Sequence, residues 1–254
     1  MMNIFDTHAH YDDRAFDEDR AELLSSLPSK GVCNIINCGC SLSSCQSSLA
    51  LSREYPFMYF ACGIHPEDCE SFGDISFLKE SLIPFIEDKK CVAVGEIGLD
   101  YHYDIDKPTQ KIFFEEQIKI ALEYDFPVIV HDREAHADTL EILKKYKPKG
   151  VMHCFSGSAE TAKEVINLGM YIGLGGVVTF KNARKSLEVA SSIPLDRLLL
   201  ETDCPYMAPV PFRGKRCDSS MIAYVAEKIA EEIGSTADEV LNVTKENAYK
   251  LFSL

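Results

Sequence analysis

The 254-residue sequence lacks any apolar run long enough to cross a membrane, since no stretch of about 18 apolar residues occurs in it. Its first residues, MMNIFDTHAH, contain no basic segment followed by an apolar stretch, so an export signal is not expected. No GxGxxG sequence follows the first apolar run, which argues against a dinucleotide-binding fold. These absences lead us to expect a cytosolic or nuclear protein.

Positive charge is also scarce, because 26 Lys and Arg residues face 40 Asp and Glu residues, for a net charge of −14. Proteins that coat nucleic acid neutralise phosphates with Lys and Arg, so the composition disfavours that class. A single strand end held in a locally basic cleft remains compatible with this charge.

The ten cysteines are scattered, none forms a paired CxxC, and several, such as Cys62 and Cys91, lie in apolar runs. A chain of this length buries enough surface to fold without disulfides, so small buried apolar residues in a reduced compartment are the favoured interpretation. Cys38 and Cys40, in the sequence CGC, leave the alternative of a soft-metal site, but no second cysteine or histidine pair lies nearby.

Eight short apolar or β-branched runs are present, at residues 3–7, 32–37, 58–63, 91–96, 127–131, 151–155, 170–175 and 198–203. Segments with helical spacing of apolar residues alternate with them, at residues 20–27, 43–53, 75–86, 111–124, 135–145, 159–168, 181–190 and 221–233. Apolar strands alternating with amphipathic helices are typical of a parallel sheet buried on both faces. The pattern predicts one domain over residues 1–254, a (β/α)₈ TIM barrel capped by a further helix at 237–252, with an open doubly wound sheet as the alternative.

His8 and His10 end the first predicted strand, where side chains two residues apart share one face and point together into the barrel mouth. Four other predicted strands also end in potential ligands, which are Glu96, His131, His153 and Asp203. Barrel active sites are built at this end of the strands. Any one of these residues could be a structural core residue, but burying the whole set without a partner is costly, which favours a metal site.

Nitrogen and oxygen donors without thiolate favour Zn²⁺, Mn²⁺ or Mg²⁺, and the two oxygens of Glu96 can bridge two divalent ions. A two-metal centre activates water near neutral pH and stabilises an in-line displacement at phosphorus. Phosphoester hydrolysis is therefore expected, while hydrolysis of an amide or ester by the same centre stays open.

Six sequence blocks, in order along nearly the whole chain, resemble the signature blocks of the TatD metal-dependent deoxyribonucleases. They are DTHAHYDD at 6–13, GIHPED at 63–68, GEIGLDY at 95–101, VIVHDREA at 128–135, HCFSGS at 153–158 and ETDCPY to PFRGKR at 201–216. The wider relatives are amidohydrolases, which often bridge their metals with a carboxylated lysine. The fourth strand here ends instead in Glu96, as in the TatD pattern.

The resemblance implies two metal positions, one held by His8, His10, Glu96 and Asp203, the other by Glu96, His131 and His153. Ligand distances of about 2–2.5 Å are then expected. Asp203 would also act as the general base for the attacking water. The family further implies a 3′–5′ exonuclease whose partner is DNA, preferably single-stranded.

Several residues near these ligands are candidates for substrate binding. The resemblance places His65 near the substrate phosphate, and Arg133, Arg213 and Lys215 are candidates to bind phosphate oxygens. Glu201, two residues before Asp203, is a candidate to orient a histidine ligand from behind. Solvated loops or strand-end packing are the plainer alternatives for these residues.

The chain departs from the family pattern after RGKR, where relatives commonly continue with Asn-Glu-Pro and this sequence has Cys217, Asp218 and Ser219. This change puts the closure of that loop in question, and we expect surface positions for His102 and His136.

Two other functions remain: a barrel hydrolase of a small phosphoester, an amide or the ester of a mischarged tRNA, or a non-catalytic partner protein. The presence of every ligand disfavours the last.

Overall fold

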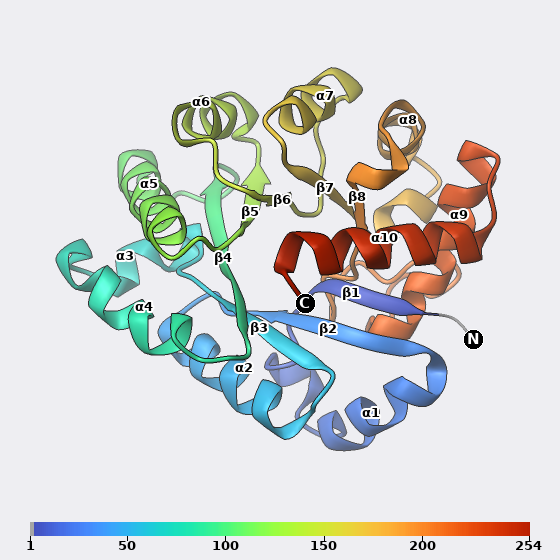
Figure 1. The fold of residues 1–254 in the computed structure, drawn as a ribbon, viewed down its shortest axis with the longest axis horizontal. Coiled ribbons are helices and arrows are strands. Elements are labelled where there is room, and N and C mark those ends of the chain that lie inside the picture. The colour runs from blue at the N-terminus through green and yellow to red at the C-terminus, as the bar shows by residue number, and fades with distance from the viewer. Residues whose placement is uncertain (1–2) are drawn as a thin grey trace.

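A computed structural model describes residues 3–254 and contains one parallel sheet of eight strands in the order β1 to β8 (Figure 1). Each strand pairs with the next one in the chain. The strands are β1 (Ile4–Ala9), β2 (Val32–Cys38), β3 (Met58–Cys62), β4 (Cys91–Asp100), β5 (Val128–Arg133), β6 (Gly150–Met152), β7 (Tyr171–Leu174) and β8 (Leu198–Leu200).

Helices surround the sheet and connect its strands (Figure 1). They are α1 (Arg20–Ser26), α2 (Leu42–Glu54), α3 (Cys69–Phe72), α4 (Leu78–Ile86), α5 (Lys107–Glu123), α6 (His136–Tyr146), α7 (Ala159–Asn167), α8 (Arg184–Ser192), α9 (Ile222–Ile233) and α10 (Ala237–Phe252). Each predicted strand and helix overlaps one of these elements, and only the short α3 was not expected. None of the described helices has the length and apolar content needed to span a membrane.

Hydrogen bonds join the first strand to the segment that follows β8. The backbone N–H of Asp203 donates to the carbonyl of His8 at 2.9 Å, and that of His10 donates to the carbonyl of Cys204 at 2.8 Å. These bonds close the sheet on itself, so the predicted (β/α)₈ barrel is confirmed and the open doubly wound alternative is wrong.

Helix α10 covers the amino-terminal end of the barrel, as expected of the additional helix (Figure 1). Its Ala248, Leu251 and Phe252 belong to one buried apolar cluster with inward-facing strand residues such as Phe5 and Ile129. The Asn247 amide also donates to the backbone carbonyl of Leu198 at 2.8 Å, at the start of β8. A second, larger apolar cluster fills the space between strands and helices. The opposite end of the barrel is therefore the one left open.

Candidate metal centre

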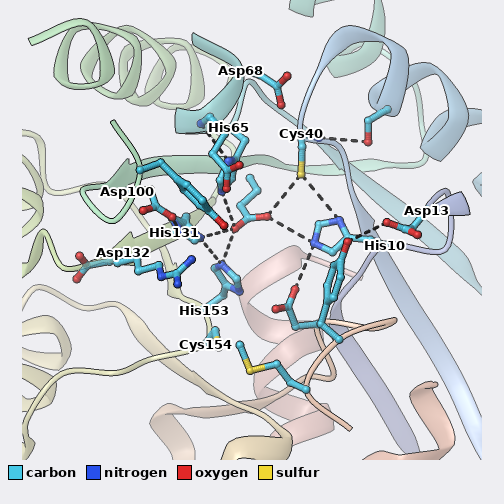
Figure 2. A pocket seen from close by; sticks show the side chains of 18 of the residues that line it. His10, Asp13, Cys40, His65, Asp68, Asp100, His131, Asp132, His153 and Cys154 are labelled. Atoms are coloured by element: carbon cyan, nitrogen blue, oxygen red, sulfur yellow. Dashed lines mark hydrogen bonds and ion pairs between the residues drawn. The ribbon is translucent and has the colours of Figure 1, made fainter. Parts of the chain in front are cut away.

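The six predicted ligands meet at this open, carboxyl-terminal end of the barrel. All of them except the fully buried His8 border the cavity that Figure 2 shows. Their positions on the strands differ from expectation in detail. Glu96 lies inside β4, His153 directly follows β6, and Asp203 lies in the loop after β8. Asp203 has a φ of 60°, a left-handed conformation that is uncommon for aspartate and is concentrated at functional sites.

The carboxylate of Glu96 occupies the middle of the cluster and is buried, with 3 % of the residue exposed. Its Oε2 lies 3.2 Å from Nε2 of His8 and 3.6 Å from Nε2 of His10. Its Oε1 lies 2.6 Å from Nε2 of His153 and 2.9 Å from Nδ1 of His131. The two oxygens thus face two different pairs of imidazoles.

Asp203 completes the first of these groups. Its Oδ1 lies 3.3 Å from Nε2 of His10 and 3.8 Å from Nε2 of His8. Ligands that bind one ion at about 2.1 Å with tetrahedral angles lie about 3.4 Å apart, so these separations are those of a coordination shell. The set contains imidazole nitrogens and carboxylate oxygens, and it fits divalent cations.

The negative charge of the cluster raises the pKa of a histidine on each side of Glu96. Burial lowers the pKa of His10, but the hydrogen bond with Asp203 and the charge of Glu96 outweigh it and raise that pKa to about 9. Burial likewise opposes protonation of His131, yet its bonds with Asp100 and Glu96 raise the pKa to about 10. The raised pKa values of His10 and His131 reflect the negative charge around them, which also favours cations, and metal binding would displace any proton on these rings.

Hydrogen-bonded partners hold the rings of His131 and His10, and an acidic residue lies behind His153. Nε2 of His131 lies 2.9 Å from Oδ2 of Asp100, and Nδ1 of His10 lies 3.0 Å from the carbonyl of Cys38. Nδ1 of His153 faces Oε1 of Glu201 at 3.8 Å. Glu201 therefore lies behind His153, on the side away from Glu96, at a distance longer than a hydrogen bond.

A cavity of about 760 Å³ opens above the cluster and is lined by acidic, histidine and tyrosine side chains. His65 borders it, with Nε2 3.6 Å from Oε1 of Glu96. Arg133 borders it as well, and its guanidinium lies 5.4 Å from the ring centroid of Tyr103. Both side chains therefore border the space that a substrate would occupy.

Arg213 and Lys215 are not among the described residues that line this cavity. The guanidinium of Arg213 lies over the ring of Phe180, 4.1 Å from its centroid. Phe180 borders a neighbouring cavity of about 290 Å³ that shares Cys154 with the metal cavity. The sequence grouped these two cations with Arg133, but of the three only Arg133 lines the metal cavity, whereas Arg213 lies against Phe180 of the adjoining one.

The segment that departs from the family pattern is anchored to the barrel. The hydroxyl of Ser219 donates to Oδ2 of Asp6 at 2.7 Å and lies 2.8 Å from the hydroxyl of Tyr11, and all three residues are buried. Cys217 is buried as well, and its backbone N–H donates to the carbonyl of Pro205. The substituted residues thus tie the loop down beside the first strand.

Sequence reasoning missed several residues at the site and misplaced another. Asp100 stood inside the recognised GEIGLDY block, four residues after Glu96, which was a usable signal. Tyr103 and Tyr206 border the cavity, but nothing in their spacing marks them. His102 is exposed as expected, whereas His136 is half-buried, and its Nδ1 lies 2.5 Å from Oδ2 of the buried Asp132.

Comparisons with known proteins agree with this geometry. The sequence profile of a family described as TatD related DNase matches residues 5–253. The chain is 42 % identical over 257 residues to an uncharacterized metal-dependent hydrolase, YabD, of Bacillus subtilis (strain 168), with 99 % of each chain covered. It is 32 % identical to the 3′-5′ ssDNA/RNA exonuclease TatD of Cronobacter sakazakii (strain ATCC BAA-894), with 98 % of this chain and 97 % of that one covered.

A solved structure is similar over the whole chain. The crystal structure of YjjV, a TatD homologue from Escherichia coli K12, superimposes with a TM-score of 0.92 at 35 % identity. The alignment covers 100 % of this chain and 99 % of that chain. The fold is therefore shared over the length of both chains.

Proposed function

We propose, from the premise that this chain belongs to the TatD family of metal-dependent hydrolases, that it hydrolyses DNA phosphodiester bonds. It shortens single-stranded DNA from the 3′ end, with water as the nucleophile. The proposal depends chiefly on the two oxygens of Glu96, each of which faces its own pair of imidazoles. That arrangement suits two divalent ions sharing one bridging carboxylate, the geometry used for in-line displacement at phosphorus.

In this proposal one position is held by His8, His10, Glu96 and Asp203, and the other by Glu96, His131 and His153. Bound Mg²⁺, Mn²⁺ or Zn²⁺ ions make water more acidic and stabilise charge on the phosphoryl oxygens. Asp203 accepts the proton of the attacking water on its carboxylate. His65 faces the phosphate from the segment after β3, and Glu201 keeps the ring of His153 in orientation.

The aromatic residues at the mouth of the cavity support a single-stranded substrate. Tyr103 is 45 % exposed and Tyr206 is 55 % exposed, and both border the metal cavity. Exposed aromatic rings stack on unpaired bases without sequence preference, whereas bases in a duplex are already stacked on one another. The direction of cleavage is supported by the 3′-5′ exonuclease to which the chain is 32 % identical.

Degradation of end-labelled DNA tests this function directly. Metal-stripped protein is mixed with single-stranded and duplex DNA labelled at the 5′ or 3′ end, and Mg²⁺, Mn²⁺ or Zn²⁺ is added back. We expect stepwise shortening of the 5′-labelled single strand, early release of the 3′ label and slower attack on the duplex. Intact DNA with every metal would refute the proposal and favour the hydrolase of a small phosphoester, amide or mischarged tRNA ester.

The cationic residues are expected to act in binding more than in chemistry. If each contacts one phosphate, Arg133→Ala and Arg213→Ala should each flatten the salt dependence of single-strand binding by roughly 0.7 in log–log slope. Because Arg133 lines the metal cavity and Arg213 and Lys215 do not, only Arg133→Ala should raise KM for a dinucleotide. The measurement is binding of a labelled single strand over a range of salt, with dinucleotide kinetics alongside.

Unchanged slopes and affinity in the triple variant of Arg133, Arg213 and Lys215 would place the DNA path elsewhere on the protein. Equal weakening across different base sequences is also expected, because phosphate contacts position a strand without reading it.

A further inference from the structure

One thiol lies beside the proposed metal positions. Cys40 follows β2 and borders the metal cavity. Its Sγ is 3.6 Å from Oε2 of Glu96 and 3.9 Å from Nδ1 of His10, contacts that Figure 2 marks with dashed lines. Ligand atoms of these three residues all lie within 4.8 Å of one another. The sequence had favoured an ordinary buried cysteine at this position, since no neighbouring ligand was visible along the chain.

The backbone around Cys40 is fixed on both sides by the elements that carry the other site residues. The N–H of Glu96 donates to the carbonyl of Gly39 at 2.9 Å, and the N–H of His65 donates to the carbonyl of Cys40 at 2.7 Å. The N–H of Cys40 in turn donates to the hydroxyl of Ser44 at the start of α2, at 3.3 Å. The thiol is therefore held next to Glu96 by the fold.

The sulfur-to-oxygen distance is the one expected for two ligands of the same ion. A zinc–sulfur bond of about 2.3 Å and a zinc–oxygen bond of about 2.1 Å at a tetrahedral angle put the two atoms about 3.6 Å apart. The separation of Sγ of Cys40 from Oε2 of Glu96 is 3.6 Å. That oxygen is the one that faces His8 and His10.

We propose that Cys40 is an additional ligand of an ion bound on the His10 side of Glu96, where it groups with Oε2 of Glu96 and with His10. On binding, the S–H bond breaks, a sulfur–metal bond forms and the proton passes to water. A thiolate donor favours Zn²⁺, Co²⁺ and Cd²⁺ over Mg²⁺, which prefers oxygen ligands. The inference rests on the metal centre of the proposed function but not on its substrate.

Two other cysteines near the site do not have this geometry. Sγ of Cys38 lies 3.4 Å from Nδ1 of His8, but Cys38 is in none of the potential ligand groups found among the described residues. Cys154 borders the cavity, but none of the potential ligand groups found within residues 3–254 includes it. Cys154→Ser is therefore a matched control, because it removes a thiol from the same cavity without touching the proposed ligand set.

Cobalt spectroscopy tests the proposal without reference to catalysis. Metal-stripped full-length protein, Cys40→Ser and Cys154→Ser are titrated with Co²⁺, and near-ultraviolet absorption is recorded along with the amount of metal bound. Wild type and Cys154→Ser should show a sulfur-to-cobalt charge-transfer band that Cys40→Ser lacks. In parallel titrations with Zn²⁺ and Mg²⁺, Cys40→Ser should bind Zn²⁺ at least roughly ten-fold more weakly than wild type and Mg²⁺ about equally well.

A wild-type protein that binds Co²⁺ without this band, or a band that persists in Cys40→Ser, would overturn the proposal. Failure to bind Co²⁺ at all would overturn it as well. If the protein does not hydrolyse DNA, the cobalt band is still expected. The band therefore tests Cys40 as a ligand, and the DNA assay tests the substrate, independently of each other. Unfolding curves of the two serine variants confirm that any missing band reflects the ligand and not the fold.

Discussion

Replacing Glu96 by alanine is expected to reduce phosphodiester hydrolysis by about three orders of magnitude or more, while the barrel remains folded. The side chain contacts His8, His10, His131 and His153. Its removal separates the two proposed metal positions and takes away their shared negative charge. The measurement is kcat for single-stranded DNA with saturating metal, together with bound metal per chain.

Folding should persist in Glu96→Ala because the barrel is stabilised by its two apolar clusters and not by this carboxylate. Glu96→Gln is the matched variant, since glutamine keeps the volume and one acceptor oxygen but loses the charge and the second metal-binding oxygen. We expect it to bind metal better than the alanine variant and still to hydrolyse slowly. Near-normal turnover in a folded Glu96→Ala protein would contradict the two-metal mechanism.

The barrel was predictable because its strands are buried on both faces and its helices on one. Runs such as residues 91–96 and 127–131 are almost entirely apolar, and their alternation with amphipathic helices is typical of a parallel sheet buried on both faces. Eight such units favoured a closed barrel over an open doubly wound sheet. Local periodicity therefore carries most of the information about the architecture. The order of the strands followed from parallel pairing of neighbours in the chain.

The ends of the strands were less predictable, because they depend on pairing between strands. Glu96 was expected to end its strand, but β4 continues to Asp100, which pairs with Arg133 of β5. This extension brings Asp100 beside His131 as an outer partner. In contrast, β6 and β8 stop before His153 and Asp203, so that these two ligands lie in loops.

Contacts between distant segments account for what the sequence did not reveal. Cys40 contacts Glu96, which lies 56 positions later in the chain. The spacing of apolar residues predicts local elements and does not predict contacts over such a separation. The course of the loop after β8 depends on Ser219 reaching Asp6, 213 positions away, and that course carries Arg213 to Phe180. Residue type indicated that these side chains were chemically competent, but only the packed structure indicates which of them meet.

The close approach of β4 and β5 requires a glycine at position 98, within β4. Gly98 has a φ of 150°, and a Cβ built on it would lie 2.0 Å from the backbone oxygen of His131. Gly98 pairs with His131 in the register of these strands, so the collision involves backbone on both sides. The same two strands carry Glu96 and His131, whose side chains are in contact at 2.9 Å.

Gly98→Ala should therefore lower the free energy of unfolding by at least about 4 kcal/mol, a loss reserved for changes that the structure cannot accommodate. Gly169→Ala is the control, since Gly169 also has a positive φ, of 88°, but no described atom lies within 4 Å of its added Cβ. That variant should lose only about 1 kcal/mol, the cost of the backbone conformation alone. Denaturant unfolding of both variants, with Co²⁺ binding measured on the folded fraction, separates collision from conformation. Equal losses in the two proteins would mean that β4 and β5 tolerate a wider spacing, and that the position of Glu96 beside His131 does not depend on Gly98.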